Sequence, residues 1–226
     1  MILYNERVDT NNHRTLGDRH VAETLALLDD DGWTPGRGRA DIGVAWRRVE
    51  VQRVDGSALV SDALRARVTV RATRAETFDL LSHPRRAPEW DSSDRGFQWV
   101  ERFDDDHTVF RNFNRPPLFA VRDSVIYRVE RAAIAPGRSL YCARSVVHAA
   151  CPVGDYLRIL QPIFAWDVVE VGDGRCEVTV LCSTPENLLP RWLFPLVVTP
   201  GWVHILRGVR GLVERPALTP AVEAGR

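Results

Sequence analysis

The chain has 226 residues, of which 45% are hydrophobic and 27% charged, as in an ordinary soluble globular protein of one large domain or two small ones. Its 30 basic and 30 acidic residues cancel, so net charge does not favour nucleic acid or an acidic lipid surface as the main partner. Every basic residue is arginine, which excludes Schiff-base chemistry on lysine and the lysine of a phosphate-binding loop.

The N-terminus and the cysteines bear on location and metal binding. The first ten residues are too polar for a secretion signal, so we expect a cytoplasmic protein. The cysteines show no CxxC spacing and are expected to be reduced and mostly buried: Cys142, Cys151, Cys176 and Cys182. His148 and Cys151 form an HxxC pair, but the two further ligands that zinc needs are not evident. We therefore predict no metal site.

An N-terminal segment, residues 1–31, is expected to carry one helix that packs on the rest of the chain. The helix is predicted over 17–30, because three apolar side chains share one face: Val21, Leu25 and Leu28. Asp18 is a suitable N-cap, and Gly32 ends the helix. Residues 32–214 are expected to form the main domain, followed by a flexible tail over 215–226.

The main domain is dominated by strand patterns. Alternation and turn signals predict about eight strands, at 44–54, 64–70, 97–103, 107–114, 122–131, 139–147, 156–169 and 176–183. A capping box formed by Thr73 and Glu76 predicts a short helix over 73–82. The order of elements therefore indicates an α+β protein in which most strands follow one another directly.

The stretch Leu188–Val213 is the most apolar part of the chain and contains no acidic residue. Its pattern predicts a short helix near 190–198 and a longer one near 200–214, continuous but kinked, or broken at Thr199, because Pro195 and Pro200 interrupt the helical hydrogen bonds. No apolar run reaches the 18 or more residues of a membrane span. Because an antiparallel sheet needs a cover for its apolar face, we expect a curved sheet of about seven to nine strands wrapped around this helix, with room for a cavity.

Several scattered residues occur in a recognisable order. They are Trp90-Asp91, Arg122-Asp123 with Arg128, Ser145–His148 with Pro152, Tyr156–Arg158 with Trp166, and Leu189-Pro190. With this order, residues 32–214 resemble a START domain, the lipid-transfer module of steroidogenic acute regulatory protein relatives, which has the helix-grip fold. The resemblance implies that a single lipid or sterol-like molecule binds beneath the C-terminal helix, without a metal or organic cofactor.

The chain departs from the START pattern at two places. Thr184 and Asn187 stand where the family often has an acid and a glycine before the last helix. Some relatives pair the buried arginine, here Arg128, with an acid on the neighbouring strand, where this chain has Arg111 and Asn112. The ligand is therefore expected to differ from those of the sterol carriers.

The predicted ligand-binding residues are Arg128, Phe110, Asn112, Ile126, Tyr156, Arg158, Trp166, Val180, Trp202 and Leu206. If the strand face with Ser124 and Ile126 looks inward, Arg128 is a buried cation that needs a partner or a ligand's polar head; in the inverted strand it is solvated. The aromatic residues line a cavity or fill a solid core, since both give the same pattern. A structural role in loops and turns is expected for Trp90, Asp91, Arg122 and Asp123.

Three functions remain open. The first is a monomeric carrier or sensor of one hydrophobic molecule that touches a membrane transiently. The second is an enzyme similar to a polyketide aromatase or cyclase, for which the acid–base candidates are His148, Tyr156, Arg128 and Asp123. The third is a groove for a partner helix. No hydrolase, metalloprotease or phosphate-loop motif is present in the sequence.

Overall fold

The computed structural model describes residues 2–39, 41–53, 55–115, 120–183 and 194–215. The elements in chain order are β1 (Ile2–Tyr4), β2 (Glu6–Arg7), α1 (His13–Leu28), β3 (Thr34–Pro35), β4 (Gly43–Arg53), β5 (Ala58–Val70), α2 (Arg74–Ser82), the 3₁₀ helix η1 (Pro84–Arg86), α3 (Ala87–Trp90), β6 (Asp94–Arg102), β7 (His107–Asn114), β8 (Arg122–Ala135), β9 (Arg138–Val147), β10 (Leu157–Arg158), β11 (Phe164–Gly172), β12 (Arg175–Ser183) and α4 (Phe194–Val213).

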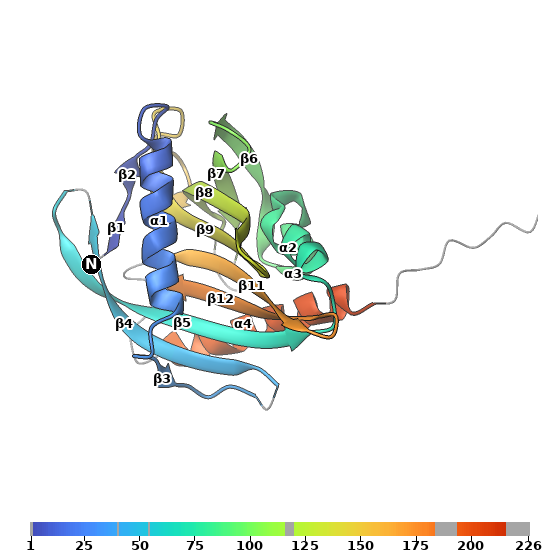
Figure 1. Cartoon of the computed structure of the whole chain (residues 1–226). Coiled ribbons are helices and arrows are strands. Elements are labelled where there is room, and N and C mark those ends of the chain that lie inside the picture. Colours follow the sequence, from blue (N-terminus) through green and yellow to red (C-terminus); the bar gives the residue numbers. More distant parts are fainter. Residues whose placement is uncertain (1, 40, 54, 116–119, 184–193, 216–226) are drawn as a thin grey trace, which may run out of the picture.

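A single curved sheet organises the chain (Figure 1). Its main path runs β1-β4-β5-β12-β11-β9-β8-β7-β6, and every pairing along it is antiparallel except the parallel edge pair β1–β4. The predicted α+β fold with a curved antiparallel sheet and a long C-terminal helix is thus confirmed. The strands that the sequence did not indicate, β1, β2 and β3, are two or three residues long, too short for an alternating pattern to show.

The sheet has an apolar cluster on each face. One cluster packs beneath α4 and α2, and it includes Val203, Leu206 and Val209, which recur every three residues along α4. The other packs against α1 and includes Leu16 and Leu28. Alternate residues of each strand supply the two clusters, and for this reason the strands are so thoroughly buried. Figure 1 shows α1 crossing one face of the sheet while α4 lies on the other.

Helix α4 is one element rather than two. It begins at Phe194, so Pro195 lies in the first turn, where a proline needs no backbone donor. Pro200 lies inside the helix and leaves the carbonyl four residues earlier without its usual N–H partner. The rest of the first predicted helix, residues 190–193, lies outside the described part of the chain, together with Leu189-Pro190, Thr184, Asn187 and the tail from 216.

Of the other two predicted helices, one matches the structure closely and one is misplaced at its start. The capping box of Thr73 and Glu76 is present as expected, with both reciprocal hydrogen bonds. Helix α1, however, starts at His13 instead of residue 17. Gly17, where the predicted helix begins, lies inside α1, and a Cβ there would come within 2.9 Å of His107 and Tyr127. Glycine thus permits the close approach of α1 to the sheet.

The predicted strand 156–169 is divided in two. β10 pairs with β8 in parallel, whereas β11 pairs with β9 and β12 antiparallel, so the two segments run in the same direction but join different strands of the sheet. Pro162, which has no N–H to donate, lies in the connection.

All four cysteines are free and buried, as expected. Among the described helices, none combines the length and hydropathy that a membrane-spanning segment requires.

Candidate ligand-binding site

The face of strand β8 that points toward α2 and α4 carries both polar and apolar side chains. Ile126 belongs to the cluster beneath α4, while Val125 and Tyr127 belong to the cluster beneath α1. Arg128, two residues beyond Ile126, therefore points to the α4 side, where it is only 6% exposed. The register places it between Thr108 of β7 and Ala143 of β9.

Arg128 has an acidic partner on its own strand. Its Nη1 lies 2.8 Å from Oε1 of Glu130 and also donates to the carbonyl of Ser82 at the end of α2, at 3.3 Å. Its guanidinium lies over the ring of Trp99, 5.5 Å from the centroid. Burial raises the pKa of the Glu130 carboxyl, and the charge of Arg128 opposes that rise. The pair therefore carries little net charge into the interior.

A cleft of about 530 Å³ opens beside this pair, between the end of α2 and strands β6 to β8. Its lining includes Ser82, His83, Trp99, Thr108, Arg128 and Glu130. Thr108 is 1% exposed, and neither its Oγ1 nor Nε of Arg128 has a hydrogen-bond partner among the described residues. Such orphaned groups are uncommon in native interiors and call for an explanation. A cleft of this volume is in the range of small-molecule sites.

An aromatic layer continues from the cleft beneath α4. The rings of Phe97, Trp99 and Phe110 contact one another, with centroids 5.0 to 6.2 Å apart. Trp166 makes edge contacts with Trp90 and Trp202 at 5.5 and 5.9 Å. Trp166 is fully buried, and its Nε1 has no hydrogen-bond partner within the described ranges. The α4 side of the sheet thus combines aromatic surface with a few unused polar groups.

Most of the predicted ligand-binding residues meet on this side. The cluster beneath α4 contains Phe110, Ile126, Trp166, Val180 and Leu206, with Trp202 packed against it. Asn112 lies on the same face by register, half-buried, and donates to Asn114. Trp90 anchors α3 by donating to the carbonyl of Leu80, and Asp91 accepts two hydrogen bonds from Ser93.

Tyr156 and Arg158 lie apart from that group, on the opposite face of β8. Arg158 and Arg111 both donate to the carboxylate of Asp123, which is 1% exposed. Tyr156 is 42% exposed and packs on Phe113. Burial alone would raise the pKa of Asp123, but the two arginines outweigh it and hold that pKa below its usual range. Arg122, the neighbour of Asp123, is buried.

Three residues of the cleft were not singled out from the sequence: Trp99, Thr108 and Glu130. The alternation that turns Arg128 inward also turns Glu130 inward, so this acidic partner was within reach of the pattern. Thr108 and Trp99 needed the register of β6, β7 and β8, which the sequence does not supply. Among the described residues, one group has the geometry to hold a metal ion, His13, Asp104 and His107, and it lies on the α1 side.

The comparisons with known proteins agree on the fold. No family model and no curated protein matches the sequence. Among solved structures, human StAR-related lipid transfer protein 5 is similar with a TM-score of 0.78 at 17% identity, over 91% of this chain and 98% of that one. A StAR-related lipid transfer protein from Xanthomonas axonopodis gives 0.63 at 20% identity, over 82% and 100%. The Zhui aromatase/cyclase of a Streptomyces species gives 0.52 at 16% identity, over 68% and 93%. The chain therefore has the fold of a START domain.

Proposed function

We propose that the protein binds one lipid or similar hydrophobic molecule on the α4 side of the sheet. The polar head of the ligand would occupy the cleft at Arg128 and Thr108, and its apolar part would lie against the aromatic layer beneath α4. The observation that carries the proposal is the pair of orphaned buried groups, Arg128 Nε and Thr108 Oγ1, at a cleft that adjoins this layer. The START fold, shared with proteins named for lipid transfer, supports it.

The energetics indicate what kind of head would fit. A buried donor without a partner costs about 1–3 kcal/mol, so a ligand that supplies an acceptor removes a cost already present in the free protein. Glu130 balances the charge of Arg128, and its carboxylate would repel an anionic head. We therefore expect an acceptor without net charge, such as a hydroxyl, a carbonyl or a zwitterionic group.

Access is proposed to run past α4, with membrane contact favouring the opening. The helix lacks a backbone donor at Pro200, and Arg207 and Arg210 tie its C-terminal half to Asp41 at 3.7 and 2.5 Å. Leu196, near its N-terminal end, is 62% exposed. A membrane surface would replace Asp41 with lipid phosphates and would cover the apolar side chains that a lifted helix exposes.

Binding is tested by energy transfer from tryptophan. Trp202 of α4 packs on Trp166, which also contacts Trp90, so a dansyl-labelled lipid bound beneath α4 quenches their emission and saturates at one molecule per chain. Arg128→Leu should weaken this binding by tenfold or more, about 1.4 kcal/mol, with an unchanged circular dichroism spectrum. The exposed Arg85→Leu is the matched control. Equal affinity of Arg128→Leu and wild type would refute the role of the cleft.

One feature supports an enzyme as the second candidate. Glu130, whose pKa burial raises, and His83 both line the cleft, which is the kind of pairing that general acid–base catalysis uses. The fold is also similar to that of an aromatase/cyclase. Of the earlier acid–base candidates, His148 is not among the lining residues of the cleft but pairs at 2.7 Å with Glu101, which is. Turnover of a bound polyketide-like ligand that Glu130→Gln abolishes, while binding persists, would favour the enzyme.

A further inference from the structure

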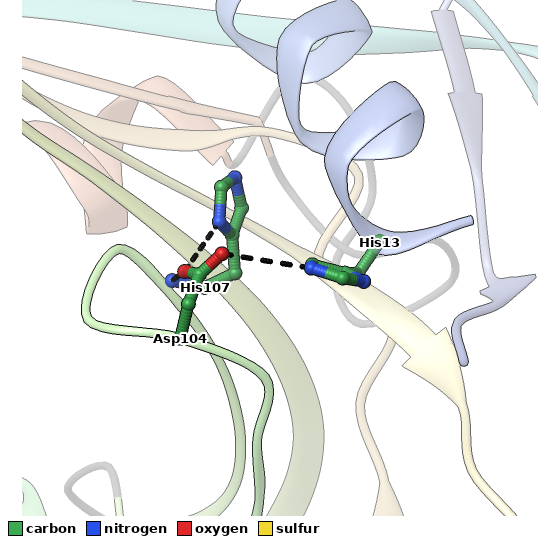
Figure 2. Close-up of side chains that lie close together, drawn as sticks. All are labelled: His13, Asp104 and His107. Carbon is green, nitrogen blue, oxygen red and sulfur yellow. Dashed lines mark hydrogen bonds and ion pairs between the residues drawn. The ribbon is translucent and has the colours of Figure 1, made fainter. Parts of the chain in front are cut away.

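A cluster on the α1 side of the sheet has no part in the proposed ligand site. His13 is the first residue of α1, Asp104 lies in the turn between β6 and β7, and His107 is the first residue of β7. Their ligating atoms all lie within 4.8 Å of one another (Figure 2). The spacing rules for metal motifs do not detect this group, because His13 is far from the other two in sequence.

His13 is held in the orientation of a metal ligand. Its Nδ1 lies 3.0 Å from the carbonyl of Thr10, and a carbonyl only accepts, so Nδ1 carries the proton. In the neutral ring Nε2 then presents a lone pair, 3.5 Å from Oδ2 of Asp104 and without a hydrogen-bond partner in the described chain. His13 is 8% exposed, and its ring stacks on Phe103. Two acceptors that face each other at this distance repel unless a proton or a metal ion lies between them.

Asp104 and His107 complete the group. Nδ1 of His107 donates to Oδ1 of Asp104 at 2.7 Å. The backbone N–H groups of Asp106 and His107 also donate to Oδ1 of Asp104, at 3.0 and 2.9 Å, so this carboxylate is held in place with its Oδ2 toward His13. The 3.5 Å between His13 and Asp104 is close to a tetrahedral edge, roughly 3.4 Å for bonds of about 2.1 Å to zinc. A metal at Nδ1 of His107 requires that the ring proton move to Nε2 and that Arg131 give up its hydrogen bond to that nitrogen.

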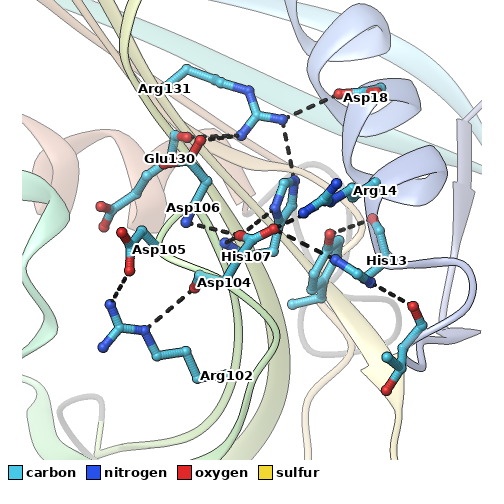
Figure 3. A network of polar contacts seen from close by, with 12 residues as sticks. His13, Arg14, Asp18, Arg102, Asp104, Asp105, Asp106, His107, Glu130 and Arg131 are labelled. Atoms are coloured by element: carbon cyan, nitrogen blue, oxygen red, sulfur yellow. Dashed lines mark hydrogen bonds and ion pairs between the residues drawn. The ribbon is translucent and has the colours of Figure 1, made fainter.

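The surrounding charges favour a cation. Figure 3 shows the acids Asp18, Asp104, Asp105 and Asp106 together with the arginines Arg14, Arg102 and Arg131. The acids are in excess, although two arginines touch the cluster. Arg131 donates to Nε2 of His107 at 3.1 Å but retains Asp18 and Asp106 as partners when that nitrogen gains a proton. Arg14 lies 3.5 Å from Asp104, and its side chain is 75% exposed, so it swings away freely.

We propose that His13, Asp104 and His107 bind a divalent transition metal such as zinc, with water completing the coordination. Two imidazole nitrogens and one carboxylate suit zinc and its neighbours better than magnesium or calcium, which prefer oxygen. The metal would join the first turn of α1 to the turn between β6 and β7. It would thus stabilise the packing of α1 on the sheet, independently of any ligand on the α4 side.

The test uses the full-length chain without a histidine tag, stripped of metal with a chelator. Titration with Co²⁺ should give visible absorption bands that saturate at one ion per chain, and Zn²⁺ should displace Co²⁺ and raise the Tm. His13→Asn and Asp104→Asn should each weaken binding by at least about tenfold. His204→Asn, on the exposed side of α4, is the matched control and should bind normally.

A variant outside the ligand set gives an effect of opposite sign. Arg14→Gln removes an exposed competing cation and should tighten binding by about two- to fivefold, with the fold intact. The proposal is overturned if Zn²⁺ and Co²⁺ do not bind, if His13→Asn and Asp104→Asn bind as wild type does, or if Mg²⁺ binds as tightly as Zn²⁺. It is equally overturned if His204→Asn is the variant that loses the metal.

Discussion

At the scale of single residues, the cleft is distinguished by buried polar groups that have no hydrogen-bond partner within the described chain. Arg128 gives its Nη1 to Glu130 and Ser82, while its Nε and the hydroxyl of Thr108 have no hydrogen-bond partner in the described chain. Alternation alone left Arg128 either inward or solvated, and the START resemblance favoured the inward face, where the structure has it. The sequence does not place Thr108 or Trp99 beside Arg128, because pairing register between strands is set by turns and bulges along the whole sheet.

The substitution Thr108→Val is expected to lower ligand affinity without lowering the stability of the protein. Valine has nearly the same shape but no hydroxyl, so it removes an orphaned polar group and should leave the free protein equal in stability or up to about 1 kcal/mol more stable. Ligand affinity should nevertheless fall, because an acceptor on the ligand loses its donor. Urea unfolding measures the first effect, and dansyl-lipid titration the second. A variant that is less stable and binds normally would contradict this role of Thr108.

Asp123 is expected to make the stability of the protein depend on pH. Its pKa is held below the ordinary aspartate value near 4, so its stabilising contribution is complete above that pH and is lost as pH falls through the lowered pKa. Asp123→Asn leaves two arginines without their carboxylate and should cost about 3–5 kcal/mol at pH 7. Urea unfolding at pH 7 and pH 3 should show the difference between variant and wild type shrinking in acid. The exposed Asp155→Asn should change neither value.

At the scale of elements, the sequence indicates types more reliably than boundaries. The long strands β4 to β9, β11 and β12 were each predicted, since period-two alternation over eight or more residues is unmistakable. The start of α1 was misplaced because Asp18 was taken as the N-cap, whereas the helix begins at His13 and Gly17 lies inside it, close to His107 and Tyr127. The break between β10 and β11 was missed because Pro162 was not taken as the end of a strand; β10 pairs with β8, and β11 with β9.

Pro200→Ala tests the proposed movement of α4. Alanine restores the missing donor and is favoured over proline by up to about 3 kcal/mol inside a helix, so the variant should be more stable and should exchange ligand more slowly. Stopped-flow transfer of dansyl lipid to vesicles measures the rate. Pro136→Ala, in the exposed turn between β8 and β9, is the matched control. If Pro136→Ala slows exchange and Pro200→Ala does not, access lies at the loops rather than at α4.

At the scale of the whole molecule, the two faces of the sheet carry different structural features. The α1 side is closed by an apolar cluster and an ionic cluster, while the α4 side carries the cleft and the aromatic layer. This division was predictable in outline, because the only long apolar helix had to cover one face. The ionic cluster of His13, Asp104 and His107 was not predictable, because residues distant in sequence meet there only after the sheet forms.

The most direct test of the central claim is native mass spectrometry of the full-length protein, taken gently from its expression host and again after incubation with a mixed lipid extract. We expect a species heavier than the bare chain by one lipid-sized molecule, which dissociates on activation and is recovered by solvent extraction. Arg128→Leu should show this species at reduced abundance, and Arg85→Leu at the wild-type level. A bare chain mass under both conditions would contradict the claim that the protein binds a lipid.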